Sequence, residues 1–112
     1  MIIRINQEFN PKVRGMISLA MKAGAIAPGE GKAQDAIRGG KASMIIVSAD
    51  ASDNTAKKFS DMGAFRDLPV VFMADRDSLG RAIGRKFAVV LAGCDKGFAD
   101  SISKNLEILN DK

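Results

Sequence analysis

The feature that most constrains the fold of this chain is an alternation between short apolar runs and amphipathic segments. Three runs, at residues 43–48, 69–73 and 87–92, consist mainly of Val, Ile, Leu, Met, Phe and Ala. They lack the polar–apolar alternation of a strand with one face in water, so they predict strands buried on both faces. Because amphipathic segments separate them, the chain is predicted to form a three-layer α/β/α sandwich around a small, mixed, mostly parallel sheet.

The helical segments are bounded by start and stop signals. Asn10 is a favourable N-cap, Pro11 suits the first helical position, and Gly24 suits a left-handed helix end. Apolar side chains recur at helical spacing in five segments, at about residues 11–23, 30–38, 54–63, 75–84 and 95–109. A brief strand within residues 25–29 brings the predicted sheet to four strands.

Length and composition indicate one domain outside the membrane. The chain has 112 residues, and domains commonly contain roughly 100–150, so we expect one domain spanning residues 1–112. The lone Cys94 cannot form an internal disulfide, which fits a reducing compartment. No apolar run approaches the roughly 20 residues of a membrane helix, and the first residues lack the order of a signal peptide. We expect a cytoplasmic protein with no membrane partner.

The composition removes the usual catalytic and metal-binding groups. There is no histidine and only one cysteine, so the commonest general base, the activating partner of Ser and Cys nucleophiles, and a zinc-binding set are all missing. Residues 29–32 resemble the end of a phosphate-binding P-loop, but Ile26 and Ala33 stand where that loop needs Gly and Ser or Thr. We expect no enzyme activity, no catalytic residue, no metal and no cofactor.

The basic residues concentrate in two stretches of the chain. The net charge is +4, and Lys and Arg outnumber Asp and Glu in residues 4–41 and, more narrowly, in residues 75–96. If those stretches share one face, their field attracts phosphate groups. A solvated surface of mixed charge explains the same composition equally well.

The sequence offers little for stacking on bases. It contains no Trp and no Tyr, and residues 85–90 only loosely follow the strand motif of RNA-recognition sheets. Phe87 opens a buried-type run, so we predict that it belongs to the core. An RNA-binding site in this chain is then expected to use helix ends, glycine turns and basic side chains.

Four motifs follow one another at characteristic spacing. They lie at residues 24–39, 49–55, 79–84 and 95–99, and with the elements between them they span about residues 11–109. Each motif alone is a weak signal, whereas four in register are specific. On these motifs the chain resembles the ribosomal protein L-seven-Ae and L-thirty-e superfamily, in particular its small bacterial members of the YlxQ type.

The resemblance implies an α/β/α sandwich, in agreement with the apolar runs. It also implies a non-catalytic protein that recognises structured RNA, chiefly the kink-turn, a helix–bulge–helix element with tandem sheared G·A pairs. In the family, the helix after the first glycine turn enters the groove at those pairs, and the turn before the last strand covers an extruded nucleotide. The implied partners are ribosomal or regulatory RNA and the ribosome. We expect a monomer.

The predicted RNA-binding residues lie at the start and end of one helix and in one turn. Two glycines let the backbone approach RNA closely, and the amides of residues 30–32 point out of a helix N-terminus. The resemblance places Arg38 at the far end of this helix and residues 85–86 in the turn facing the bulge. The full predicted set is Gly29, Glu30, Gly31, Lys32, Arg38, Arg85 and Lys86. An ordinary glycine-rich helix start with solvated charges is the alternative interpretation.

Three positions depart from the family pattern. The strongest kink-turn binders carry Asn, then Glu or Gln, then Lys, where this chain has Gly31, Lys32 and Asp35. Gly31 has no side chain to bond a base edge, so we expect contacts to the RNA backbone rather than base-specific readout.

Two other functions stay open at this point. A protein-interaction adaptor of the same fold, without RNA binding, is the main alternative. Such adaptors tend to be acidic, whereas this chain is basic around the predicted RNA-binding helix. A small hydrolase or nucleotide-binding protein would need a phosphate loop or a general base that the sequence lacks.

Overall fold

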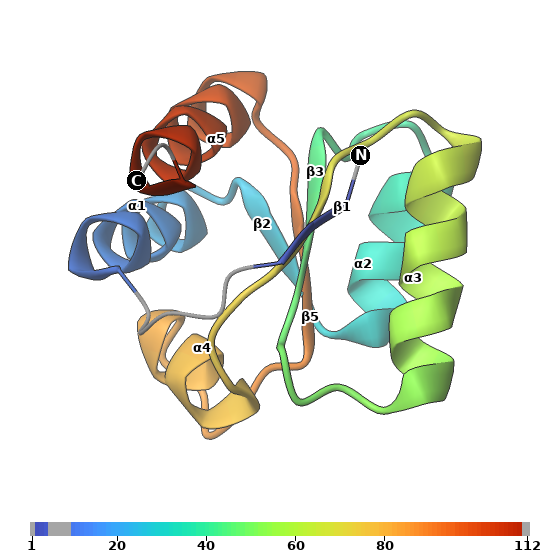
Figure 1. Ribbon diagram of the computed structural model, residues 1–112, viewed down its shortest axis with the longest axis horizontal. Coiled ribbons are helices and arrows are strands. Elements are labelled where there is room, and N and C mark those ends of the chain that lie inside the picture. Colours follow the sequence, from blue (N-terminus) through green and yellow to red (C-terminus); the bar gives the residue numbers. More distant parts are fainter. Residues whose placement is uncertain (1, 5–9, 111–112) are drawn as a thin grey trace.

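The computed structural model describes residues 2–4 and 10–110 and arranges them around one sheet (Figure 1). Over these residues the helices are α1 (Pro11–Lys22), α2 (Glu30–Arg38), α3 (Asp53–Phe65), α4 (Arg76–Ala82) and α5 (Lys96–Asn110). The strands are β1 (Ile2–Arg4), β2 (Ile26–Pro28), β3 (Met44–Val47), β4 (Val70–Phe72) and β5 (Val90–Gly93). Helices α1, α4 and α5 cover one face of the sheet, and α2 and α3 cover the other. The predicted α/β/α sandwich is confirmed.

The sheet is mixed, with the strand order β1-β4-β3-β5-β2. Strands β1 and β3 run parallel to β4, whereas β5 runs antiparallel to both β3 and β2. Strand β5 reverses because α4, about 10 Å long at 1.5 Å per residue, stays at the end of the sheet where β4 finishes. The amide of Ala88, just before β5, accordingly donates to the carbonyl of Arg76 at the start of α4 (2.9 Å).

Two details of the predicted sheet were wrong. The sheet has five strands rather than four, and antiparallel pairings are as frequent as parallel ones. The additional strand is β1, whose pairing with β4 joins Ile3 to Val71. A strand of three residues is too short to carry a periodic signal, so only its long-range partner identifies it.

Both faces of the sheet are buried, as the continuous apolar runs predict. Along β3, Met44 and Ile46 pack with the core under α1, α4 and α5, whereas Ile45 and Val47 pack with the core under α2 and α3. All four side chains are fully buried, and the fully buried Phe59 of α3 belongs to the second core. The two cores fix the sheet between its helix layers and thereby place the loops at its ends. Within the described residues, no helix is both long enough and apolar enough to span a bilayer.

Candidate functional site

A groove of about 380 Å³ opens at the end of the sheet where β2 finishes and β5 begins. One wall is the start of α2 and the other is the loop between α4 and β5. Its lining residues are Pro28, Gly29, Glu30, Arg85, Lys86, Phe87, Ala88 and Val89. The fold therefore brings together two of the predicted segments, residues 29–30 and residues 85–86, although they are far apart in the sequence.

The start of α2 is fixed by the backbone of Gly29. Its amide donates to the carbonyl of Val90 (2.8 Å), and its carbonyl accepts from the amide of Ala33 (2.9 Å). The φ of 91° and ψ of 159° at this residue lie in a region that only glycine adopts readily. Gly29 thus joins β5 to the first turn of α2 in a geometry that other residues would strain.

The first turn of α2 has no side-chain cap. As the N-cap residue, Gly29 offers no side-chain acceptor, and the described residues provide no side-chain cap for the amides of Glu30, Gly31 and Lys32. These amides form the positive end of the helix dipole, where anions bind favourably. The Glu30 carboxylate lies at the groove too, but the guanidinium of Arg85 and the ammonium of Lys86 outnumber it.

The opposite wall is held by backbone hydrogen bonds. The amide of Arg85 donates to the carbonyl of Gly80 (2.8 Å), and that of Ala88 donates to the carbonyl of Arg76 (2.9 Å). Gly80 is buried directly against this loop, and a Cβ at residue 80 would overlap the backbone of Phe87. The loop and α4 therefore form one packed unit whose position depends on the absence of a side chain at Gly80.

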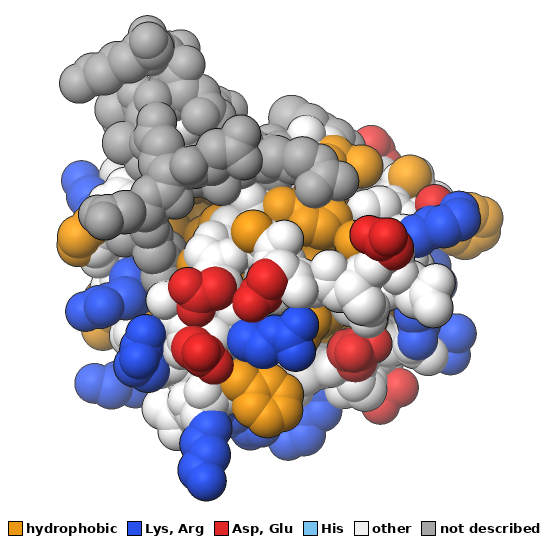
Figure 2. Space-filling model, turned by 60° about the horizontal axis from the view of Figure 1, so that its bottom comes forward, with side chains coloured by type: hydrophobic (Ala, Val, Ile, Leu, Met, Phe, Trp, Pro, Cys, Tyr) orange, Lys and Arg blue, Asp and Glu red, His pale blue; other side chains and the backbone are white. Residues whose placement is uncertain are grey.

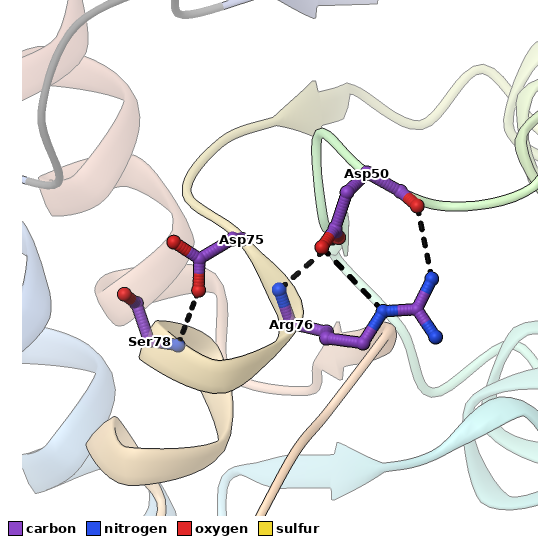
Figure 3. Close-up of polar contacts among 4 residues, drawn as sticks. All are labelled: Asp50, Asp75, Arg76 and Ser78. Carbon is purple, nitrogen blue, oxygen red and sulfur yellow. Dashed lines mark hydrogen bonds and ion pairs between the residues drawn. The ribbon is translucent and has the colours of Figure 1, made fainter.

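An ion pair anchors this unit to the end of β3. The Asp50 carboxylate accepts from the amide of Arg76 (3.1 Å) and lies 3.5 Å from its Nε, while the guanidinium donates to the Asp50 carbonyl (3.0 Å) (Figure 3). Beside it, the Asp75 carboxylate accepts from the amide of Ser78 (2.7 Å) and caps α4. Hydrogen bonds from the backbone and the side chain of Ser78 lower the pKa of Asp75, and the nearby charge of Arg81 lowers it by a smaller amount.

Phe87 is the clearest correction to the sequence analysis. We predicted a core residue, but its side chain is 59 % exposed and lines the groove. The buried part of the run begins one residue later, at Ala88, because the bonds from Arg85 and Ala88 hold the intervening loop on the outside of α4. No local signal in the sequence distinguishes this arrangement from a strand that begins at Phe87.

The structure does not bring all predicted residues to the groove. Lys32 lines a separate hollow of about 420 Å³ beside Asp35 and Cys94. Burial raises the pKa of the Cys94 thiol, which makes it a poor nucleophile. Arg38 is exposed at the last turn of α2, about 12 Å along the helix axis from its start. In the described part of the chain, no three His, Cys, Asp or Glu side chains gather as a metal-binding group.

The comparison with protein families identifies the fold's relatives. The sequence profile of the Ribosomal protein L7Ae/L30e/S12e/Gadd45 family matches residues 11–103. The chain belongs to this family. The resemblance drawn from the four motifs is thereby confirmed, and the groove lies within the matched range.

Members of the family from several organisms are similar over most of their length. RNA-binding protein YlxQ of Bacillus subtilis (strain 168) is 35% identical over 92 residues, or 82% of this chain and 92% of that protein. RNA-binding protein YlxQ of Enterococcus faecium is 31% identical, over 92% of this chain and 99% of that protein. Large ribosomal subunit protein eL30 of Methanoregula boonei is 30% identical, over 86% of this chain and 94% of that protein.

Solved structures of the same fold agree. A protein with unknown function from Bacillus halodurans C has a TM-score of 0.82 and 32% sequence identity, covering 85% of this chain and 96% of that chain. The Giardia lamblia 15.5kD RNA binding protein has a TM-score of 0.69 and 19% identity, covering 88% of each chain. At that identity the second likeness concerns the fold alone.

Proposed function

We propose that this protein binds structured RNA without catalysing a reaction on it, and that the groove between α2 and the α4–β5 loop receives the sugar-phosphate chain. The observation that carries the proposal is the composition of this groove. It contains Gly29, which begins α2 without a side-chain cap, and the cations of Arg85 and Lys86. Backbone amides at such a start donate to phosphate oxygens, and the two cations neutralise phosphate charge. The names of the YlxQ relatives, which are RNA-binding proteins, support this function.

Phe87 suggests how the groove selects unpaired nucleotides. Its ring is exposed in the loop that carries both cations. An aromatic face of this kind stacks on an unpaired base, and such stacking contributes roughly 1–3 kcal/mol per base. A duplex without a bulge offers phosphates but no free base, so the proposed ligand is an RNA in which helix and bulge adjoin, such as a kink-turn.

The proposed contacts are mainly to the RNA backbone. Gly31 offers no side chain for a base edge, and Asp35 places a carboxylate beside Lys32 at the second hollow. Base-edge contacts along α2 are therefore few, and selectivity would come from the shape of the RNA and from stacking on Phe87. Ribosomal or regulatory RNA in the cytoplasm, bound by a monomer, is the proposed setting.

A salt-titrated gel shift with a kink-turn duplex tests the proposal. Wild-type protein is expected to bind, with an affinity that falls as salt rises, and Arg85→Glu with Lys86→Glu is expected to abolish binding. The matched control is Lys58→Glu on α3, an exposed lysine outside the groove, which should leave binding unchanged. Phe87→Ala should weaken binding to the kink-turn while leaving weak binding to an unbulged duplex as it was. Binding that ignores salt, or groove variants that bind like the wild type, would contradict the proposal.

A further inference from the structure

Helix α1 presents a purely basic exposed side. It buries Val13, Ile17 and Ala20 against the core, and its exposed charges are those of Lys12, Arg14 and Lys22. The helix contains no Asp or Glu. A helix that lies on a protein surface usually mixes charges of both signs, so an exposed side with cations alone needs a reason.

A hydrogen bond places two of these cations beside α4. The hydroxyl of Ser18 donates to the carbonyl of Ala82 (2.6 Å), which joins the middle of α1 to the end of α4. Arg14 and Lys22 lie four residues before and after Ser18, so they flank it on the same side of the helix.

The end of α4 and the loop after it add one cation each, Arg81 and Arg85. Arg81 precedes Ala82, and the amide of Arg85 donates to the carbonyl of Gly80. The four exposed cations Arg14, Lys22, Arg81 and Arg85 therefore belong to α1 and to the C-terminal end of α4 with the loop after it, the two segments that the Ser18 bond joins, and we call them the α1–α4 surface.

Most of the charge of this surface has no carboxylate beside it, although the charge of Arg81 lies near the carboxylate of Asp75. None of its four cations takes part in an ion pair among the described residues, whereas Arg76 pairs with Asp50 and Lys57 pairs with Asp61. Of the nearby acidic residues, Asp75 is the N-cap of α4 and Asp77 lies in its first turn. Figure 2 shows Lys and Arg side chains along the left side of the face that it draws, acidic side chains nearer the centre, and further Lys and Arg side chains on the right.

The α1–α4 surface is continuous with the groove, because Arg85 belongs to both. We propose that it is a second RNA contact, which binds the phosphates of a stem that continues past the groove; this inference rests on the proposed function. Three of its four cations are arginines, whose planar fork suits phosphate oxygens. Along α1 the surface extends from Arg14 to Lys22, about 12 Å at 1.5 Å per residue, which is long enough to contact more than one phosphate of an RNA backbone.

Two RNA lengths and one double variant test this contact. The probes are a kink-turn RNA with stems of a full helical turn and the same RNA trimmed to the pairs beside the bulge. Arg14→Gln with Lys22→Gln is expected to weaken binding to the long RNA roughly 10-fold and to lower the salt slope by about two. Binding to the trimmed RNA should not change. Lys57→Gln with Lys58→Gln, two exposed lysines of α3, is the matched control and should affect neither RNA.

Hydroxyl-radical footprinting of the wild-type protein tests the same contact without a substitution, so its result does not depend on whether a variant folds. The long RNA is expected to show protected sugars in one stem beyond those that the groove covers. A double variant that binds both RNAs like the wild type, or a footprint confined to the bulge, overturns the second contact and leaves the groove proposal standing. Failure of the wild type to bind either RNA overturns the proposed function itself, and the second contact with it.

Discussion

Helix α2 begins differently from the other helices. The starts of α1, α3, α4 and α5 are capped by the side chains of Asn10, Ser52, Asp75 and Asp95, each of which accepts from an amide of the first turn. Helix α2 begins at Gly29, which has no side chain to do so. Capped starts satisfy first-turn amides within the protein and stabilise it, whereas no side chain caps the first-turn amides of α2. The difference supports the proposal that the start of α2 binds an anionic ligand, while the capped starts serve stability.

The largest expected effect comes from giving α2 a cap. Gly29→Asp would place a carboxylate over the first-turn amides and a negative charge in the groove, so RNA affinity should fall roughly 10- to 100-fold. Gly29→Ala is the matched control, because both substitutions strain the backbone at residue 29 by about 1–3 kcal/mol but only Asp fills the site. Gel shifts of both variants measure the RNA affinity, and urea unfolding of both measures the free energy of unfolding. Equal RNA affinities of the two variants would remove the distinction between α2 and the capped helices.

The second prediction concerns the wall that faces the start of α2. Gly80→Ala should displace the loop at Phe87, weaken RNA binding, and lower the free energy of unfolding by about 1–3 kcal/mol. Gly15→Ala in α1 is its control, since a Cβ there meets no atom within 4 Å and an exposed helical position gains about 0.5–1 kcal/mol from the change. Thermal or urea unfolding compares the stability of each variant with that of the wild type. A Gly80→Ala protein as stable as the wild type would mean that the loop is not held as described.

The third prediction addresses a capped start. Ser52→Ala removes the acceptor for the amide of Thr55 and should lower the free energy of unfolding by about 1 kcal/mol. RNA affinity should stay at the wild-type value, because α3 lies outside the groove. Urea unfolding measures the change in stability of Ser52→Ala, and the gel shift measures its RNA affinity. Loss of RNA binding in a protein that remains folded would show that the capped starts also serve the ligand.

The smallest effect is a dependence on pH at Asp75. Its pKa is lowered in the folded protein, chiefly by the hydrogen bonds from Ser78, so its carboxylate stabilises the fold above the unfolded-state pKa. That contribution is lost as the pH falls through the lower, folded-state value. Asp75→Ala should therefore be less stable than the wild type at about pH 7, and the difference should shrink at about pH 3. Urea unfolding at both pH values measures it, and a difference that does not shrink would rule out the carboxylate as its source.

Most of the fold could be predicted because it depends on periodicity. The continuous run at residues 43–48 predicted β3, and the Asn10-Pro11 signal predicted the start of α1. The short β1 could not be predicted, since its only evidence is its pairing with β4. The reversal of β5, which pairs antiparallel with β3, follows from the short connection through α4 and is equally invisible in a local pattern.

The candidate site was less accessible to sequence reasoning. Periodicity marked residues 29–32 as a helix start, but only the family resemblance suggested that residues 85–86 belong near it, and the groove now shows this proximity. The exposure of Phe87 depends on packing against Gly80. The bracing of the loop depends on Asp50, which reaches Arg76 across the end of the sheet. Both are long-range contacts without a local sequence signal.

The amides at the start of α2 test the central claim most directly. In an NMR titration with a kink-turn RNA, the amides of Glu30, Gly31 and Lys32 should shift and exchange more slowly with solvent as phosphate oxygens accept from them. The amide of Thr55, already bonded to Ser52 in the capped start of α3, should not change. Binding that leaves the three α2 amides unshifted, with the changes confined to other surfaces, would contradict the account.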